Sequence, residues 1–327
     1  MQAKLNIVIA AEFELAEKIV ELLEKGTLPI ETLSVAEIYP FNEEQGLRFN
    51  NRAVAQNSIE EIDWTLVHYL FFAGETKHAP YLAQAADSGC VVIDLNGICA
   101  ALQDVPLIVP GFNDEQLQDV RNRNIVSLAD PQISQLLLTC GEMLGRGEIN
   151  RLLVSSILPA SYVNAEQVKK LAGQTARLLN GIPLDDDEQR LAFDAAPFKL
   201  NNTQRLLQQF EKILPNSEIQ LVIHQLQSAV FYGLGQQVTA LSDFQTDSSG
   251  WQTSWEQNPL LQWHQNSIVT PVSNGEQQQE QESDMIHISD VIELENGIQF
   301  WSVCDEQRFS LALLGIKLAE KVYLQGY

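Results

Sequence analysis

Short apolar runs alternate with helical periodicities through the first 128 residues, and this alternation constrains the fold more than any other feature of the chain. The run LNIVIA (residues 5–10) has the length of a buried strand, and the apolar residues after it recur at helical spacing until Gly26. Further segments of strand length follow, some separated by helical segments: TLSVAEIY, WTLVHYLFFAG, CVVIDL and NIVSLA. Consecutive βα units place their strands parallel. Residues 1–128 are therefore expected to form an α/β, Rossmann-like domain around a mostly parallel sheet, with a hairpin in LRFNNRAVAQ that turns at its two asparagines.

The residues after 128 follow another pattern and predict a second domain. A helix over 130–144, a strand and two more helices precede long β segments with no helix between them: EIQLVIHQLQSAVFYGLGQQVTAL, SIVTPVS and ISDVIELENGIQFWSVCDE. This order predicts an α+β domain with a mixed or antiparallel sheet over residues 129–307. The helical segment 308–327 is expected to pack back on the first domain. The Gln/Glu-rich segment 274–284 is expected to be a solvated loop.

The charge balance excludes several classes of partner. The chain has 43 acidic and 20 basic residues and a formal net charge of −23, so its field repels nucleic acid and anionic membrane surfaces. Its apolar runs have the length of strands and not of membrane spans, and its N-terminus resembles a first strand more than a signal peptide. We expect a cytoplasmic protein that binds neither nucleic acid nor a membrane.

The cysteines and histidines form no pattern typical of a metal site. The four cysteines include no C-x-x-C pair, and the five histidines are scattered singly along the chain. Reduced, partly buried thiols are the expectation for a cytosolic protein of this kind. The sequence therefore predicts neither a metal site nor a disulfide.

The first strand-to-helix turn is the place where a fold of this class would bind a dinucleotide. That turn reads AAEFELAE (residues 10–17) and contains no glycine, although the G-x-G-x-x-G motif needs glycines for a tight turn and a close approach to pyrophosphate. Phe13 places a ring there, and Glu12 and Glu14 add negative charge, which costs about 2–3 kcal/mol per unit-charge pair at ~6 Å and an effective dielectric of ~20. No cofactor is expected at this turn.

A second junction, SLADPQISQLLL (residues 127–138), predicts a strand that leads directly into a helix. Asp130 suits the N-cap position, and Pro131 suits the first helical position, where a missing N–H costs nothing. The N-terminus of such a helix is where an α/β enzyme exposes a nucleophile. Proline cannot act as one.

Several blocks of the chain resemble the aspartate-semialdehyde dehydrogenase family. They are spread over nearly its whole length: SGCVVID (88–94), DVPLIVP (104–110), LLNGIP from Leu178, LAF from Leu191, AVFYG from Ala229 and QFWSVCD from Gln299. The resemblance implies a nucleotide-binding α/β domain (residues 1–128 with 308–327) and a dimerising α+β domain (129–307). Family members reductively dephosphorylate aspartyl phosphate with NADPH, through a cysteine thioester.

The resemblance also implies that the residues of this reaction are missing from the second domain. The family's P-N-C-x-x-x-Q stretch matches ADPQISQ (129–135), which puts Pro131 in the place of the nucleophile. In QSAVFYGL (227–234), Leu234 replaces the histidine base and Gln227 replaces the arginine that holds the substrate carboxylate. Leu158 replaces an expected glutamine.

The positions that would bind anions in the first domain are also changed. The phosphate-binding arginine of the family matches Ala100, and the glycines of its nucleotide loop match Ala10, Phe13 and Ala16. This pattern is similar to the Usg-type proteins, paralogues that keep the dehydrogenase shape with an eroded site. No other spacing of nucleophile and base suggests a relocated site.

Three functions are consistent with these residues. The first is a non-catalytic homologue that works by association, as a homodimer or by pairing with a paralogous dehydrogenase subunit. The second is an NADP-dependent oxidoreductase acting on an aldehyde in amino-acid biosynthesis. The third is a sensor that holds a small ligand in the former cleft, which the leucines would make apolar and the net charge would bias against anions.

Overall fold

The strands of the first part of the chain form one parallel sheet. The computed structural model describes residues 4–41, 46–198, 202–244, 249–275 and 284–327. Seven strands lie in the order β5-β2-β1-β6-β7-β9-β8, and every pair is parallel. Their bounds are Leu5–Ala10 (β1), Ile30–Glu37 (β2), Ala55–Ser58 (β5), Tyr69–Phe72 (β6), Val91–Asp94 (β7), Leu107–Ile108 (β8) and Ile125–Leu128 (β9). The predicted Rossmann-like sheet is confirmed.

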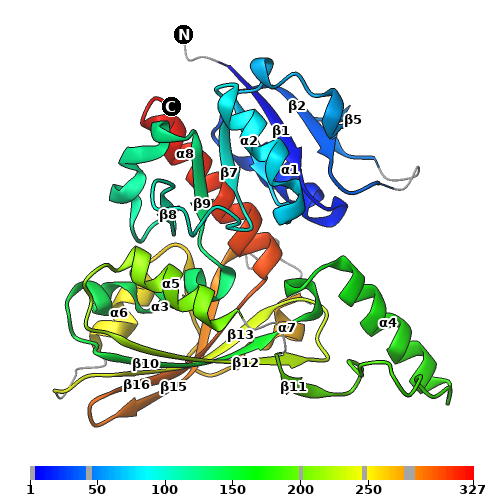
Figure 1. The fold of residues 1–327 in the computed structure, drawn as a ribbon. Coiled ribbons are helices and arrows are strands. Elements are labelled where there is room, and N and C mark those ends of the chain that lie inside the picture. The colour runs from blue at the N-terminus through cyan, green and yellow to red at the C-terminus, as the bar shows by residue number, and fades with distance from the viewer. Residues whose placement is uncertain (1–3, 42–45, 199–201, 245–248, 276–283) are drawn as a thin grey trace. The chain divides into compact units, whose positions relative to one another are not determined.

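The chain divides into two compact units, and the first contains segments distant in sequence. Unit 1 comprises Met1–Asp130, Gln208–Pro215 and Ser310–Tyr327. Its helices are α1 (Phe13–Lys25), α2 (Ala79–Asp87) and α8 (Leu314–Leu324), and α8 lies beside β7 (Figure 1). Shorter 3-10 segments complete it: η1 (Ile59–Glu61), η2 (Trp64–Leu66), η3 (Thr76–His78) and η4 (Asp114–Asn122).

Two local predictions in unit 1 have different outcomes. The hairpin β3 (Arg48–Phe49) and β4 (Arg52–Ala53) turns at Asn50 and Asn51, both with positive φ, as the sequence predicts. The strand predicted from WTLVHYLFFAG is shorter than expected. Its first residues form the 3-10 turn η2, because the Asp63 carboxylate accepts a hydrogen bond from the Thr65 amide and caps that turn.

Unit 2 comprises Pro131–Leu207 and Asn216–Phe309 and contains a mixed sheet. The strand order is β11-β12-β10-β13-β16-β15-β14, with β10–β12 and β14–β15 parallel and the other pairs antiparallel. The bounds are Arg151–Leu158 (β10), Ala195–Pro197 (β11), Gln220–Ser228 (β12), Leu234–Leu241 (β13), Leu261–Trp263 (β14), Ile286–Leu294 (β15) and Gly297–Cys304 (β16). This mixed sheet confirms the predicted α+β class.

Helices α3 and α6 lie on one side of this sheet (Figure 1). The helical elements are α3 (Pro131–Gly145), η5 (Ala160–Tyr162), α4 (Ala165–Leu179), α6 (Ser249–Gln257) and α7 (Pro271–Gly275). Trp251 and Trp255 of α6 are buried against Phe300 of β16, with ring centroids 6.4 and 5.2 Å away. Helix α5 (Thr203–Ile213) and the π-helix Glu306–Leu313 each continue from unit 2 into unit 1.

The β segment predicted at SIVTPVS is wrong. Pro271 cannot donate to a strand ladder, and it starts the short helix α7. The turn before α7 is closed by Thr270 and Ser273, since the amide of each donates to the hydroxyl oxygen of the other, at 2.8 and 3.1 Å. The sequence also gave no indication of α6, and most of the segment 274–284, predicted to be a loop, lies outside the described residues. Among the helices described here, none has the length and apolar character needed to cross a bilayer.

Candidate functional site

The start of α3 places an inert residue at the position matched to the nucleophile. Pro131 opens the helix and is buried. The nearest thiol along the helix, Cys140, is also buried, and burial raises its pKa to about 12. A thiol is nucleophilic as the thiolate, so Cys140 does not replace the missing group.

Next to Pro131, a network of carboxamides and hydroxyls joins α3 to the sheet. Gln132 Nε2 donates to the Tyr162 hydroxyl at 2.8 Å and to Gln225 Oε1 at 3.3 Å. Gln236 Nε2 donates to the Gln132 carbonyl at 3.0 Å and to Ser156 Oγ at 3.2 Å. Gln132, Ser156 and Gln236 have no exposed surface. We call these five residues the amide network; amides and hydroxyls hold α3 in place but supply no general base near pH 7.

Sequence reasoning did not find the amide network. Gln225 and Gln236 stand among other polar residues in the strand segments QLVIHQLQS and LGQQVTAL, so nothing local marks them. The five residues come from five different elements, α3, β10, η5, β12 and β13, and their pairing depends on how these elements pack. A second contact of the same kind joins Gln135 of α3 to β16, where its amide donates to Ser302 Oγ at 2.9 Å and its oxygen accepts from the Cys304 thiol at 3.1 Å.

The structure places Leu158, Gln227 and Leu234 at one end of the unit 2 sheet. Leu158 pairs with Gln227 across β10 and β12, and the pairing of Ile157 with Gly235 sets Leu158 beside the start of β13. Leu158 and Leu234 have no exposed surface. Leucine side chains neither transfer protons nor bind anions, so the matched base and glutamine positions are apolar.

A buried titratable group, Glu306, lies beside this sheet end, and the sequence did not reveal it. The Glu306 carboxylate, 1% exposed, accepts hydrogen bonds from the Ser161 hydroxyl and from the Gly233 amide, the latter at 2.9 Å. Burial, and next the charge of Asp305, raise the pKa of Glu306 to about 7. The carboxyl joins η5 and the β12–β13 turn to the end of β16 and has almost no access to solvent.

Ala100, matched to the phosphate-binding arginine, lies in a closed turn of unit 1. The buried Asp94 carboxylate accepts from the amides of Ile98 and Cys99 at 3.2 and 2.8 Å. The Lys212 ammonium donates to the carbonyls of residues 100, 102 and 105 at 2.8, 2.5 and 2.7 Å. This cation is saturated by backbone oxygens, so the turn has no positive group directed toward a phosphate.

The first strand-to-helix turn of unit 1 contains an aromatic pair. Ala10 and Ala16 are fully buried, and Phe13 packs edge to face on Phe41 with centroids 5.2 Å apart. Glu12 occupies the N-cap position of α1 without capping it through its side chain. Side chains with Cβ atoms, a ring pair and a carboxylate stand where a dinucleotide would need open backbone N–H groups, so these residues do not fit a pyrophosphate.

The remaining candidate groups in the described part of the chain do not form a metal site. No cluster of three or more His, Cys, Asp or Glu side chains that could hold an ion is found among those residues. Next to Pro131 the hydrogen bonding is done by neutral amides and hydroxyls, and the Glu306 carboxyl near Leu234 is buried. Such an arrangement can support a stable scaffold, but it has neither the nucleophile nor the cationic groups of acyl-phosphate chemistry.

Comparison with known proteins gives related sequences over the full length. No family model matches the chain. A USG-1 protein homolog of Haemophilus influenzae is 52% identical over 327 residues and covers 100% of both chains. Aspartate-semialdehyde dehydrogenase 2 of Vibrio cholerae is 27% identical over an alignment of 332 residues that covers 98% of each chain. The crystal structure of aspartate semialdehyde dehydrogenase II from Vibrio cholerae superposes with a TM-score of 0.90 at 25% identity, covering 99% of this chain and 100% of that one.

Proposed function

Because the chain belongs to the aspartate-semialdehyde dehydrogenase family and is close to its USG-1 members, we propose that it is a non-catalytic member of that family that works through protein association. Unit 2 provides the association surface, and the protein acts as a homodimer in the cytoplasm without a bound cofactor.

The chemistry of the matched positions supports the absence of catalysis. The dehydrogenase reaction implied by the family needs a thiolate, a base and cationic groups for two anions, and each contributes a large part of the rate. Pro131, Leu234, Gln227 and Ala100 supply none of these. Loss of one group can be compensated by a neighbour, but the amide network next to Pro131 contains no titratable group near neutral pH.

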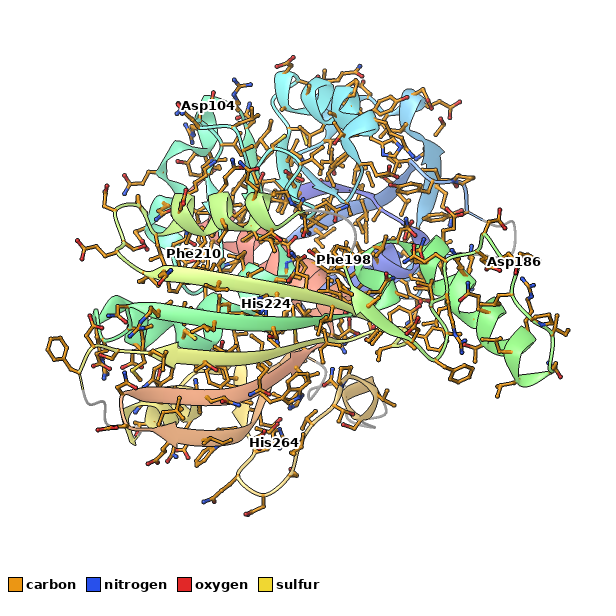
Figure 2. All side chains as sticks on the ribbon, turned by 60° about the horizontal axis from the view of Figure 1, so that its bottom comes forward. Asp104, Asp186, Phe198, Phe210, His224 and His264 are labelled. Atoms are coloured by element: carbon orange, nitrogen blue, oxygen red, sulfur yellow. The ribbon has the colours of Figure 1, made fainter. Side chains whose placement is uncertain are left out.

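The proposal that the protein works through association rests on the uncovered face of the unit 2 sheet. Figure 2 shows this face, with His224 on β12. The strand pairings align three strands on this face. We call it the open face, and its residues are Arg151, Leu153, Ser155, Ile157, Gln220, Val222, His224, Leu226, Gly235, Gln237, Thr239 and Leu241. Leu153, Val222 and Leu226 remain 40, 36 and 39% exposed.

The open face differs in charge from the rest of the protein. None of its twelve residues is acidic, although the chain has 43 acidic residues and a net charge of −23. Depletion of charge and exposed aliphatic side chains are typical of the centre of a protein interface. A surface required only for solubility would share the acidic character of the chain.

Sedimentation equilibrium of the whole protein tests the association. We expect a dimer, and we expect Leu153→Asp and Val222→Asp to weaken it strongly, because each buries an unpaired carboxylate in the interface. Leu66→Asp is the matched control, since Leu66 is 65% exposed in unit 1 and lies outside the open face. A wild-type monomer at all concentrations would contradict the homodimer, and mixing with the paralogous dehydrogenase subunit of the same cell would then test the other form of association.

The alternative function is an NADP-dependent oxidoreductase acting on an aldehyde in amino-acid biosynthesis. The similarity to aspartate-semialdehyde dehydrogenases over the full chain favours it. It requires NADP to bind, and a ligand that binds only the folded protein raises its melting temperature. We expect NADP to cause no such rise; a saturable rise would support the alternative.

A further inference from the structure

The carboxyl ends of β1, β2 and β6 bring together a group of aromatic and acidic side chains in unit 1. Strand β1 has β2 on one side and β6 on the other, so the chain leaves this sheet in opposite directions at that point. In open α/β sheets, ligands bind outside the carboxyl ends of the strands at such a switch point. The residues that follow the three strands here are Glu12 and Phe13, Tyr39 and Phe41, and Glu75. We call these five residues the edge cluster.

The edge cluster is built to hold its members in fixed positions. Tyr39 donates its hydroxyl proton to Glu75 Oε1 at 2.9 Å and meets the His78 ring edge to face at 5.1 Å. His78 Nδ1 in turn accepts from the Glu75 amide at 3.2 Å. Phe13 and Phe41 form the second aromatic pair. In this cluster a carboxylate accepts from a tyrosine hydroxyl and aromatic rings pack edge to face, whereas a dinucleotide site would have glycines and backbone N–H groups.

A cation already occupies part of this arrangement. The Lys77 ammonium lies 3.0 Å from Glu75 Oε1 and 5.6 Å from the centroid of the Tyr39 ring. Carboxylate contact combined with a ring face is the geometry that stabilises ammonium and guanidinium groups. Lys77 and Glu75 are 62 and 58% exposed at their side chains, so the lysine can leave without disturbing the core.

The electrostatic character of the cluster agrees with this geometry. The pKa of Tyr39 is raised by burial first, then by its hydrogen bond to Glu75 and by the charges of Glu75 and Glu12. Burial disfavours a charge of either sign, but the two carboxylates act on a ligand according to its sign, since they repel a phosphate and attract a cation.

We propose that the edge cluster binds a small organic cation carrying an ammonium or guanidinium group, which takes the place of Lys77 against Glu75 and the Tyr39 ring. A doubly wound fold ordinarily holds a phosphate at this position, whereas the carboxylates of the edge cluster favour a cation there. This inference does not depend on the proposed association, because all the residues involved lie in unit 1 and far in sequence from the open face.

The test is a titration of the full-length protein with n-butylammonium, in which the backbone amide NMR signals of Tyr39 and Glu75 report binding. The matched neutral probe is n-butanol, and NADP is the anionic probe, all at constant ionic strength. We expect saturable shifts with n-butylammonium alone. Lys77→Met should strengthen binding several-fold by removing the internal competitor, and Glu75→Gln should abolish it. Glu31→Gln removes an exposed carboxylate from the opposite end of β2 and should leave binding unchanged.

Three results would overturn the inference. Equal shifts with n-butanol would show an apolar site without a preference for charge. Unchanged binding in Glu75→Gln or in Lys77→Met would show that the cation does not occupy the place we assign to it. Saturable shifts of the same signals with NADP, and none with n-butylammonium, would show that the switch point still accepts phosphate.

Discussion

Replacing Glu306 by glutamine should change how the stability of the protein depends on pH. Glutamine has the same shape, and it can still accept from the Gly233 amide and donate to the Ser161 hydroxyl oxygen, so Glu306→Gln removes a titrating group with little change in packing. In the wild type the buried carboxyl holds its proton to about pH 7, because burial raises its pKa. In the unfolded chain a glutamate loses its proton near pH 4.5.

The size of the effect follows from these two values. Between pH 4.5 and 7 the unfolded state binds fewer protons than the folded state, so the free energy of unfolding falls as the pH rises. The difference of about 2.5 pKa units corresponds to a loss of about 3 kcal/mol, complete above pH 7. Asp94, whose pKa burial also raises, contributes a slope of the same sign in both proteins.

Urea unfolding at pH 5 and pH 8 measures this, with tryptophan fluorescence as the signal, since the buried Trp251 and Trp255 lie in unit 2 with Glu306. We expect Glu306→Gln to lose less stability than the wild type between the two pH values, by up to about 3 kcal/mol. Glu115→Gln removes one exposed carboxylate and controls for the change in net charge. Equal losses in wild type and Glu306→Gln would refute the argument that this carboxyl is held protonated by its surroundings.

Further predictions concern the framework of unit 1 and the buried thiols. Gly97 has a φ of 61° and a Cβ there would lie 2.9 Å from the Leu128 carbonyl oxygen, so Gly97→Ala should lower the free energy of unfolding by about 1–3 kcal/mol; an unchanged urea midpoint would contradict this. Lys212→Met leaves three carbonyls without their shared donor and should cost about 1–3 kcal/mol, with a variant of an exposed lysine, Lys169→Met, as the comparison. Burial raises the pKa of both Cys90 and Cys140 to about 12, so iodoacetamide at pH 8 should label them only after unfolding; rapid labelling of the native protein would show that they are accessible.

The alternation of strands and helices was sufficient to predict the parallel sheet, because each strand of unit 1 is a local apolar segment. Residues 208–215 of unit 1 and helix α6 of unit 2 could not be assigned in this way. Residues 208–215 belong to unit 1 through contacts such as those of Lys212 with the turn after β7, and no periodicity within α5 encodes that contact. Helix α6 was not predicted because it is held by the packing of Trp251 and Trp255 on Phe300, and Phe300 belongs to a strand that is distant in sequence.

The same distinction applies to the candidate site. The location of Leu158, Gln227 and Leu234 at one end of a sheet follows from strands that the sequence indicates. The amide network and the environment of Glu306 depend on side chains from several elements meeting, and the sequence carries no local signal for such a meeting. The pKa of Glu306 in particular results from burial, which only the three-dimensional structure determines.

The most direct test of the account is whether the whole protein reduces NADP when it is supplied with aspartate semialdehyde and phosphate. The protein is passed over a gel-filtration column, and NADPH formation is measured by absorbance in each fraction across the protein peak. We predict no NADPH formation above the protein-free reaction in any fraction. NADPH formation that rises and falls with the protein concentration across the peak would contradict the central claim that this scaffold no longer supports the dehydrogenase reaction.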